Sequence, residues 1–298
     1  MTLRIERLDT ARCQGGENPL WDPRRKCLYL IDNTGRKAHR YDPVSGRTQS
    51  WAFPSVITTL VLRENGGAVV TLRSGIHTFD FDTGELALLH PLTDPPPYVY
   101  NDGKVDRRGR FVIGASTANF AEPGPEGGLF RLDPDRSLTR LDGGIHFSNG
   151  PCWSPDGGTL YFSDSWINTI YAYDYDMALG RVSNRRVFAN TSEMGGVPDG
   201  ATVDADGRYW VALFRAAKIA SYSPDGTLDR VIEMPVKLVS SVSFGGTDLD
   251  RLFVTSIAHD IAGAAQGGGG DTDEELAGSV FVIDGLGARG IAEPYFGG

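Results

Sequence analysis

Residues 21–43 read WDPRRKCLYLIDNTGRKAHRYDP, and residues 153–176 follow the same plan as WSPDGGTLYFSDSWINTIYAYDYD. Each stretch contains a turn built from Asp, Pro or Gly, a short strand, a polar turn and a second strand that ends in Tyr-Asp. Proline presets φ, glycine supplies positive φ and aspartate folds back onto the backbone, so these residues are typical of turns. The plan predicts antiparallel strands joined by tight turns.

The pattern occurs six times along the chain. The other copies cover 64–84, 105–135, 203–226 and 244–285, and 298 residues divided among six copies leave just under 50 for each. Short strands at this period, about four per copy, predict an all-β, six-bladed β-propeller. No interior linker is evident, so residues 1–298 are expected to form a single domain. Residues 3–8 are expected to close the last blade. Calcium loops would also explain the Asp-Gly pairs, but the ligand spacing of an EF-hand is missing.

The bulk properties exclude several classes of protein. A formal net charge of -9 argues against a nucleic-acid partner and against attraction to an anionic membrane. Residues 1–15 lack the apolar stretch of a signal peptide, and no segment approaches the ~20 apolar residues of a membrane span. Three cysteines without a C-x-x-C make a disulfide framework or a zinc finger a weak interpretation. We expect a cytoplasmic protein, either a monomer or a small homo-oligomer.

One position in the repeat carries polar side chains. It is occupied in successive copies by Glu17, Thr59, Asn101, Asn149, Asp199 and Ser241, at steps of 42, 42, 48, 50 and 42 residues. Equivalent positions on the innermost strands of a propeller lie on a ring around its axis. Oxygen-bearing side chains that converge there suit a hard divalent cation. Polar residues at strand starts also satisfy backbone groups near solvent, but two acids packed together without a cation would repel each other.

Five motifs connect these residues to a known family. They are GENPLWDP (16–23), NDGKVDRRGRF (101–111), SNGPCWSPDGGTLYFSDS (148–165), PDGATVDADGRYWVAL (198–213) and FGGTDLDRLFVTS (244–256). In this order they resemble the gluconolactonase/regucalcin family, also called the SMP-30 family. The resemblance implies a six-bladed propeller with one divalent ion held by Glu17, Asn149 and Asp199. Calcium is the first choice, with zinc, manganese, iron or magnesium as alternatives.

The resemblance also implies a reaction. Family members are mostly lactonases for sugar acids, which suggests a metal-dependent hydrolase that opens a small lactone to its hydroxy acid. In this hypothesis Asp199 accepts the proton of the attacking water, and Asn101 orients water or substrate; nucleophilic attack by the Asp199 carboxylate stays open. A broader ester or phosphotriester hydrolase is one alternative. A non-catalytic propeller, either metal-binding or a scaffold for other proteins, is another.

The substrate pocket departs from the family pattern. Sugar-lactone members commonly read R-x-N-D-G-K, and Val99 stands here where that Arg would be. Because Arg offers five donors and Val offers none, we expect a less hydroxylated substrate, or recognition from another loop. The predicted substrate contacts are Asn101, Tyr100, Asn119, His146 and Trp166, with Phe120 and Asp164 as further wall candidates. Long loops at 115–127 and 257–278 are expected to overhang the metal. His39, His77 and His90 are expected to be structural.

Overall fold

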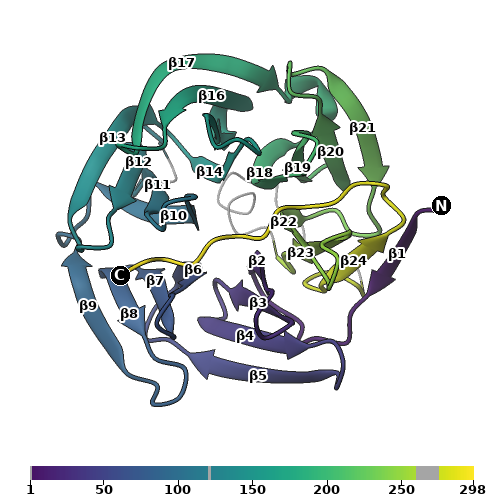
Figure 1. Ribbon diagram of the computed structural model, residues 1–298, viewed down its shortest axis with the longest axis horizontal. Helices are drawn as coiled ribbons and strands as arrows, with labels where there is room; N and C mark the ends of the chain where they lie inside the picture. The colour runs from purple at the N-terminus through teal and green to yellow at the C-terminus, as the bar shows by residue number, and fades with distance from the viewer. Residues whose placement is uncertain (1, 120–121, 260–274) are drawn as a thin grey trace.

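The computed structural model describes residues 2–119, 122–259 and 275–298, in which the strands form six four-stranded antiparallel sheets. The sheets stand around a central axis like the blades of a propeller (Figure 1). The predicted six-bladed, all-β architecture is therefore confirmed. In this part of the chain the helices are two 3-10 turns, η1 (Ser165–Ile167) and η2 (Ser192–Met194). No helix in the described ranges has the length and apolar character needed to cross a membrane.

In blades one to five the first strand lies next to the axis and the last lies at the rim (Figure 1). Blade one comprises β2 (Gly16–Asp22), β3 (Cys27–Asp32), β4 (Lys37–Asp42) and β5 (Arg47–Ala52). Blade two comprises β6 (Ile57–Leu62), β7 (Ala68–Leu72), β8 (Gly75–Phe79) and β9 (Leu86–Pro91). Blade three comprises β10 (Tyr98–Val105), β11 (Phe111–Thr117), β12 (Gly127–Leu132) and β13 (Leu138–Ile145). Blade four comprises β14 (Ser148–Trp153), β15 (Thr159–Asp164), β16 (Thr169–Asp176) and β17 (Arg181–Asn190). Blade five comprises β18 (Val197–Val203), β19 (Tyr209–Phe214), β20 (Lys218–Tyr222) and β21 (Leu228–Glu233).

Blade six joins the two ends of the chain. Its inner strands are β22 (Val239–Gly245), β23 (Arg251–Ser256) and β24 (Phe281–Asp284), and its outermost strand is β1 (Arg4–Arg7). β1 pairs antiparallel with β24, with Arg4 opposite Asp284. The expectation that the N-terminal segment closes the last blade is confirmed, and the N-terminus supplies the rim strand.

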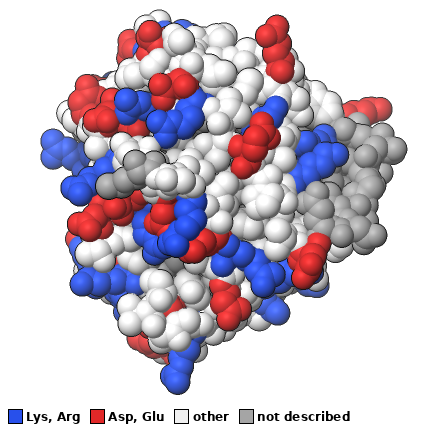
Figure 2. All heavy atoms as spheres, turned by 90° about the vertical axis from the view of Figure 1, so that its right-hand side faces the viewer, with Lys and Arg blue, Asp and Glu red and all other residues white. Residues whose placement is uncertain are grey.

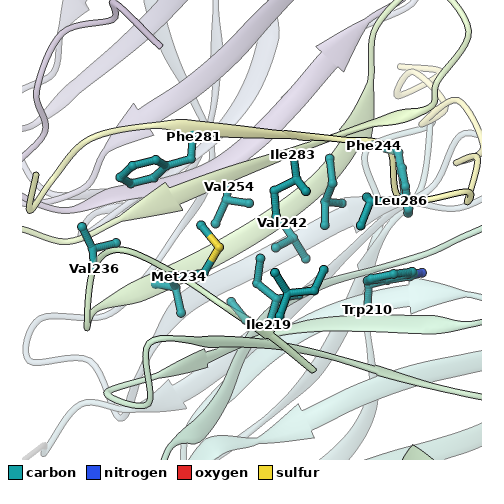
Figure 3. Packing of buried hydrophobic residues seen from close by; sticks show 14 residues of the cluster. Trp210, Ile219, Met234, Val236, Val242, Phe244, Val254, Phe281, Ile283 and Leu286 are labelled. Carbon is teal, nitrogen blue, oxygen red and sulfur yellow. The ribbon is translucent and has the colours of Figure 1, made fainter. Parts of the chain in front are cut away.

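Apolar side chains fill the spaces between neighbouring blades. Between blades five and six, Trp210 and Ile219 of one sheet pack against Val242 and Phe281 of the other, and Met234 completes the cluster (Figure 3). A similar cluster joins blades one and two, and another joins blades two and three. Burial of apolar surface, worth about 25 cal/mol per Å², therefore holds the sheets together face to face. This packing fixes the inner strands around the axis.

Residues 285–298, which we call the C-terminal strap, cross the axis after β24 (yellow in Figure 1). The Phe296 N–H donates to Leu62 O at 2.8 Å, and the Gly297 N–H donates to Gly109 O at 2.9 Å. The Tyr295 hydroxyl donates to Asp22 Oδ1 at 2.6 Å. Leu62 and Asp22 are the last residues of β6 and β2. The strap therefore covers the end of the axis at which the inner strands finish.

The charged side chains on the side of the molecule near β1 and β21 are mixed in sign, with Lys and Arg beside Asp and Glu (Figure 2). Among the described residues, this side shows no uniformly basic area of the kind that nucleic-acid binding requires. The cytoplasmic location, the oligomeric state and the absence of nucleic-acid and membrane partners remain predictions.

Candidate active site

The six ring residues predicted from the repeat all lie on innermost strands. Their positions are Glu17 on β2, Thr59 on β6, Asn101 on β10, Asn149 on β14, Asp199 on β18 and Ser241 on β22. All six inner strands also change register at this level, as between Glu17 and Leu20 in blade one and between Pro198 and Ala201 in blade five. A β-bulge re-aims side chains and increases the local twist. The repeated bulge therefore interrupts the alternation of side chains beside the axis.

Hydrogen bonds connect the inner strands from blade to blade at this level. Asn101 is central, because its Nδ2 donates to Ser148 O at 2.7 Å and to Asn149 Oδ1 at 3.0 Å. Asn149 Nδ2 donates in turn to the Ser165 hydroxyl at 2.9 Å. Further bonds run from Leu60 N to Asn18 Oδ1, from Thr59 Oγ1 to Asn101 O, from Ser165 Oγ to Pro198 O and from Ser240 Oγ to Gly16 O. This network fixes the orientation of both amides.

Two carboxylates on the ring lack a positive partner. Glu17 is half-buried and Asp199 is 8% exposed, and neither forms an ion pair in the part of the chain that the structure describes. Burial, together with the negative charges of Asp199 and Asp102, raises the pKa of Glu17 well above its usual range. Burial and the charge of Asp102 do the same to Asp199. The ring is thus a concentrated, uncompensated negative site.

The side chains present fit a divalent cation. Glu17 and Asp199 supply carboxylate oxygens. Asn149 supplies its amide oxygen, which accepts a hydrogen bond from Asn101 Nδ2 at 3.0 Å. Hard cations take such oxygen ligands. The raised pKa values of the two carboxyls have the cause that a bound cation removes, namely unneutralised charge in a buried place. The chemistry of these side chains is compatible with the predicted ligand set, which stays a prediction.

The predicted substrate contacts divide into two groups. Asn101 lies on the ring and is half-buried, and His146 lies just before β14 with 26% of its side chain exposed. Trp166, on η1 beside Ser165, is 44% exposed, and Asn119 is exposed in the loop after β11. Tyr100 is different, because it is 3% exposed and packs edge-on against Phe130 in a core cluster. Its placement does not support contact with substrate.

The remaining predicted wall residues and loops either differ from the expectation or lie outside the described residues. Asp164 is fully buried and accepts hydrogen bonds from His146 N, His146 Nδ1 and Phe147 N. It therefore orients His146 and is not itself a pocket wall. The predicted loop at 115–127 is shorter than expected, since β11 continues to Thr117 and β12 starts at Gly127. Phe120 and most of the loop at 257–278 lie outside the described residues.

The structure also brings residues to the site that the motif assigned no role. Both oxygens of Asp102 accept backbone hydrogen bonds, Oδ2 from Gly150 N at 3.0 Å and Oδ1 from Gly103 N at 2.8 Å. Burial raises the pKa of Asp102, and Lys104 partly offsets that effect. Lys104 pairs with Glu293 of the strap at 2.8 Å. The motif NDGK (101–104) thus contains one ring residue, one source of negative potential and one buried cation.

A cavity of about 260 Å³ lies elsewhere, between blades four and five, lined by residues that include Tyr161, Phe188 and Pro224. It includes none of the ring residues. We therefore place the candidate active site at the axis, where the acids and amides of the ring lie, and not in this cavity.

Comparisons with known proteins identify the family of the chain. The family profile described as the SMP-30/Gluconolactonase/LRE-like region matches residues 15–258. Regucalcin of Xenopus laevis is 32% identical over 306 residues, covering 100% of this chain and 99% of its own. The pentonolactonase XacC of Haloferax volcanii is 34% identical over 284 residues, covering 95% and 94%. The solved structure of a calcium-binding protein, regucalcin, from Agrobacterium tumefaciens has a TM-score of 0.87 and 27% identity, covering 97% and 96%.

Proposed function

Because the chain belongs to the SMP-30/gluconolactonase/LRE-like family, we propose that it is a metal-dependent lactonase that opens a small cyclic ester to its hydroxy acid. The observation that carries the proposal is the pair of carboxylates without a positive partner, Glu17 and Asp199, beside the Asn149 amide on the axis. A catalyst for ester opening needs a base and a positive centre in one place. The pentonolactonase among the relatives supports the same class of reaction.

Asp199 and Glu17 have different roles in the proposed reaction. A divalent ion held by Glu17, Asn149 and Asp199 would polarise the ester carbonyl and stabilise negative charge on its oxygen. Asp199 accepts the proton of the attacking water as a general base. Glu17 has no hydrogen bond to another side chain among the described residues, so its carboxylate is available to the ion. We retain direct attack by Asp199 as the other form of the mechanism.

Asn101 contributes an acceptor and no donor. Both protons of its Nδ2 are used inside the ring, toward Ser148 O and Asn149 Oδ1. Its Oδ1 is the atom that remains for an O–H group of water or substrate. His146 supports the substrate side, since Asp164 binds its Nδ1 at 2.9 Å and leaves Nε2 for a ligand. We therefore propose that Asn101 orients the water and that His146 contacts the substrate.

Val99 indicates the chemical class of the substrate. It is half-buried on β10, opposite Ser116 of the next strand and two residues before Asn101. A valine there offers no hydrogen bond to a hydroxylated ring. We propose a lactone with few hydroxyl groups as the preferred substrate, with an aldonolactone as a weaker one.

The test is a panel of five- and six-membered lactones, with and without sugar hydroxyls, assayed on chelator-treated protein before and after addition of calcium, manganese or zinc. We expect activity only with metal, and a loss of about 100-fold or more in kcat for Asp199→Asn, the usual range for removing a general base. Asp135→Asn, which changes an exposed turn residue of blade three, is the matched control and should behave as wild type. A folded Asp199→Asn variant with full activity would refute the assignment.

One alternative has an observation in its favour. The solved structure at 27% identity is named a calcium-binding protein, so binding of a metal without turnover remains a second candidate function. The same experiment separates the two. Tight metal binding that depends on Glu17 and Asp199, with no lactone opened under any condition, would establish the binding protein.

A further inference from the structure

Away from the axis, the described residues contain one more group of side chains able to hold a metal. Cys13, Asp32 and His39 are each at least 95% buried, and their ligand atoms lie within 4.8 Å of one another. Cys13 belongs to the segment that joins β1 to β2, Asp32 ends β3, and His39 lies on β4. The group therefore sits where the rim strand of blade six leads into blade one.

His39 has a nitrogen with no partner. Its Nδ1 is 2.8 Å from the Ser50 hydroxyl, while Nε2 is buried and without a hydrogen bond. Burial lowers the pKa of His39, so the ring is neutral. When Nδ1 donates to Ser50, Nε2 presents a lone pair, which is the usual arrangement of a metal-binding histidine. An orphaned buried nitrogen is unfavourable, and a bound ion would give it a partner.

The groups around His39 are also compatible with a bound metal ion. Both hydrogen bonds to Asp32, from Gly15 N at 2.8 Å and from Gly35 N at 3.0 Å, go to Oδ1, which leaves Oδ2 for a ligand. The Thr34 hydroxyl, on the turn after Asp32, is a second buried polar atom without a partner. Burial, followed by the charge of Asp32, raises the pKa of Cys13 to about 12. Without an ion this thiol stays protonated.

We propose that Cys13, Asp32 and His39 form a second metal site, for a zinc-class divalent ion. One sulfur, one imidazole nitrogen and one carboxylate oxygen suit zinc or cobalt better than calcium. Ligands bound at ~2.0–2.3 Å lie roughly 3.5 Å apart around a tetrahedral ion, so closure needs about an ångström of movement. Binding converts the Cys13 thiol to a thiolate and releases its proton to solvent.

The position gives the ion a structural role. The Cys13 N–H donates to Gly278 O, next to β24, at 2.9 Å, and Gly15 binds Asp32 of blade one. An ion that binds the folded chain and not the unfolded chain stabilises the fold by mass action. Here it would fasten the segment that closes the ring of blades.

The test uses cobalt(II) and zinc(II) with the full chain. Glu17→Gln/Asp199→Asn protein lacks both carboxylate ligands of the axial site, so a zinc-class ion that it still binds tightly is assigned to another site. We expect one equivalent of cobalt with a cobalt–thiolate charge-transfer absorption, which zinc displaces, and release of about one proton per ion. Cys13→Ser should abolish the absorption, and His39→Gln should weaken cobalt binding at least ~10-fold. Cys27→Ser, a buried cysteine outside the group, should keep both properties.

Three results would overturn the proposal. They are the absence of a bound equivalent in the axial variant, an equivalent without thiolate absorption, and an absorption that survives in folded Cys13→Ser protein. The first two need no substitution in the proposed site, so a variant that fails to fold does not rescue the proposal. None of these results depends on lactone turnover, so they test the second metal site independently of the proposed lactonase activity.

Discussion

Replacement of Lys104 by methionine tests the ion pair between blade three and the C-terminal strap. Lys104 Nζ is 2.8 Å from Glu293 Oε1, and the two side chains are 11% and 15% exposed. Burial opposes the charge of Lys104, but Glu293 and Asp102 outweigh that effect and raise its pKa. Methionine keeps the length of the side chain and removes the charge. It leaves two buried carboxylates without their cation.

The expected cost follows from that geometry. Removing one partner of a fully buried pair costs about 3–5 kcal/mol, and the residual exposure places Lys104→Met near the lower end, at about 3 kcal/mol. An unfolding entropy of ~2.1 cal/mol/K per residue gives roughly 0.6 kcal/mol/K for 298 residues. The variant should therefore melt roughly 5 °C below wild type. Glu293→Gln should cost less, because Lys104 keeps Asp102 as a partner.

The assay is a double-mutant cycle followed by thermal and denaturant unfolding. Adding Glu293→Gln to Lys104→Met removes one of the stranded charges and should recover about 1 kcal/mol or more. Because the pKa of Lys104 is raised, its contribution is fully present below the ordinary lysine pKa of ~10.4, and the loss should be equal at pH 6 and pH 8. Strictly additive costs in the cycle would refute the coupling that we infer.

Three further changes probe the axis. Burial, Asp199 and Asp102 raise the pKa of Glu17, so above the ordinary glutamate pKa of ~4.3 the metal-free folded protein holds more protons than the unfolded chain. Its stability should therefore fall as pH rises from that value through the raised pKa. Melting curves of chelator-treated Glu17→Gln should show a smaller fall, and an unchanged slope would contradict the assignment. Val99→Arg should lower KM several-fold for an aldonolactone and leave KM for an unhydroxylated lactone unchanged, which paired steady-state assays would show. Gly200→Ala should cost roughly 1–3 kcal/mol in denaturant unfolding, because the new Cβ would lie 2.0 Å from Ser241 Oγ, and wild-type stability would mean that the inner strands move apart freely.

The fold was predictable because its signal is repeated. Turn residues such as those at 106–109, 154–158 and 204–207 recur at a nearly constant period, and six weak signals at one spacing are stronger than any one of them. The ring was predictable for the same reason, since Glu17 and Asp199 occupy one position of the repeat.

The remaining details depend on local backbone geometry. Tyr100 precedes Asn101, and alternation along a strand could have placed it in the core. The bulge between Tyr100 and Gly103 suspends that alternation and brings Asp102 to the axis as well, and no apolar pattern records such a bulge. Asp32 and His39 come together because β3 and β4 pair with Leu30 opposite His39, and Cys13 reaches them from the segment before β2. Their separation in sequence matches no zinc motif, so only the register reveals them.

The C-terminal strap has a consequence for traffic through the molecule. It covers the end of the axis where the inner strands finish. We therefore expect a small molecule to reach the ring from the opposite face and to leave through that face as well. If the protein is the lactonase that we propose, its lactone substrate and its hydroxy acid product would compete for this single access route. Progress curves should slow as product accumulates, with inhibition that added lactone relieves.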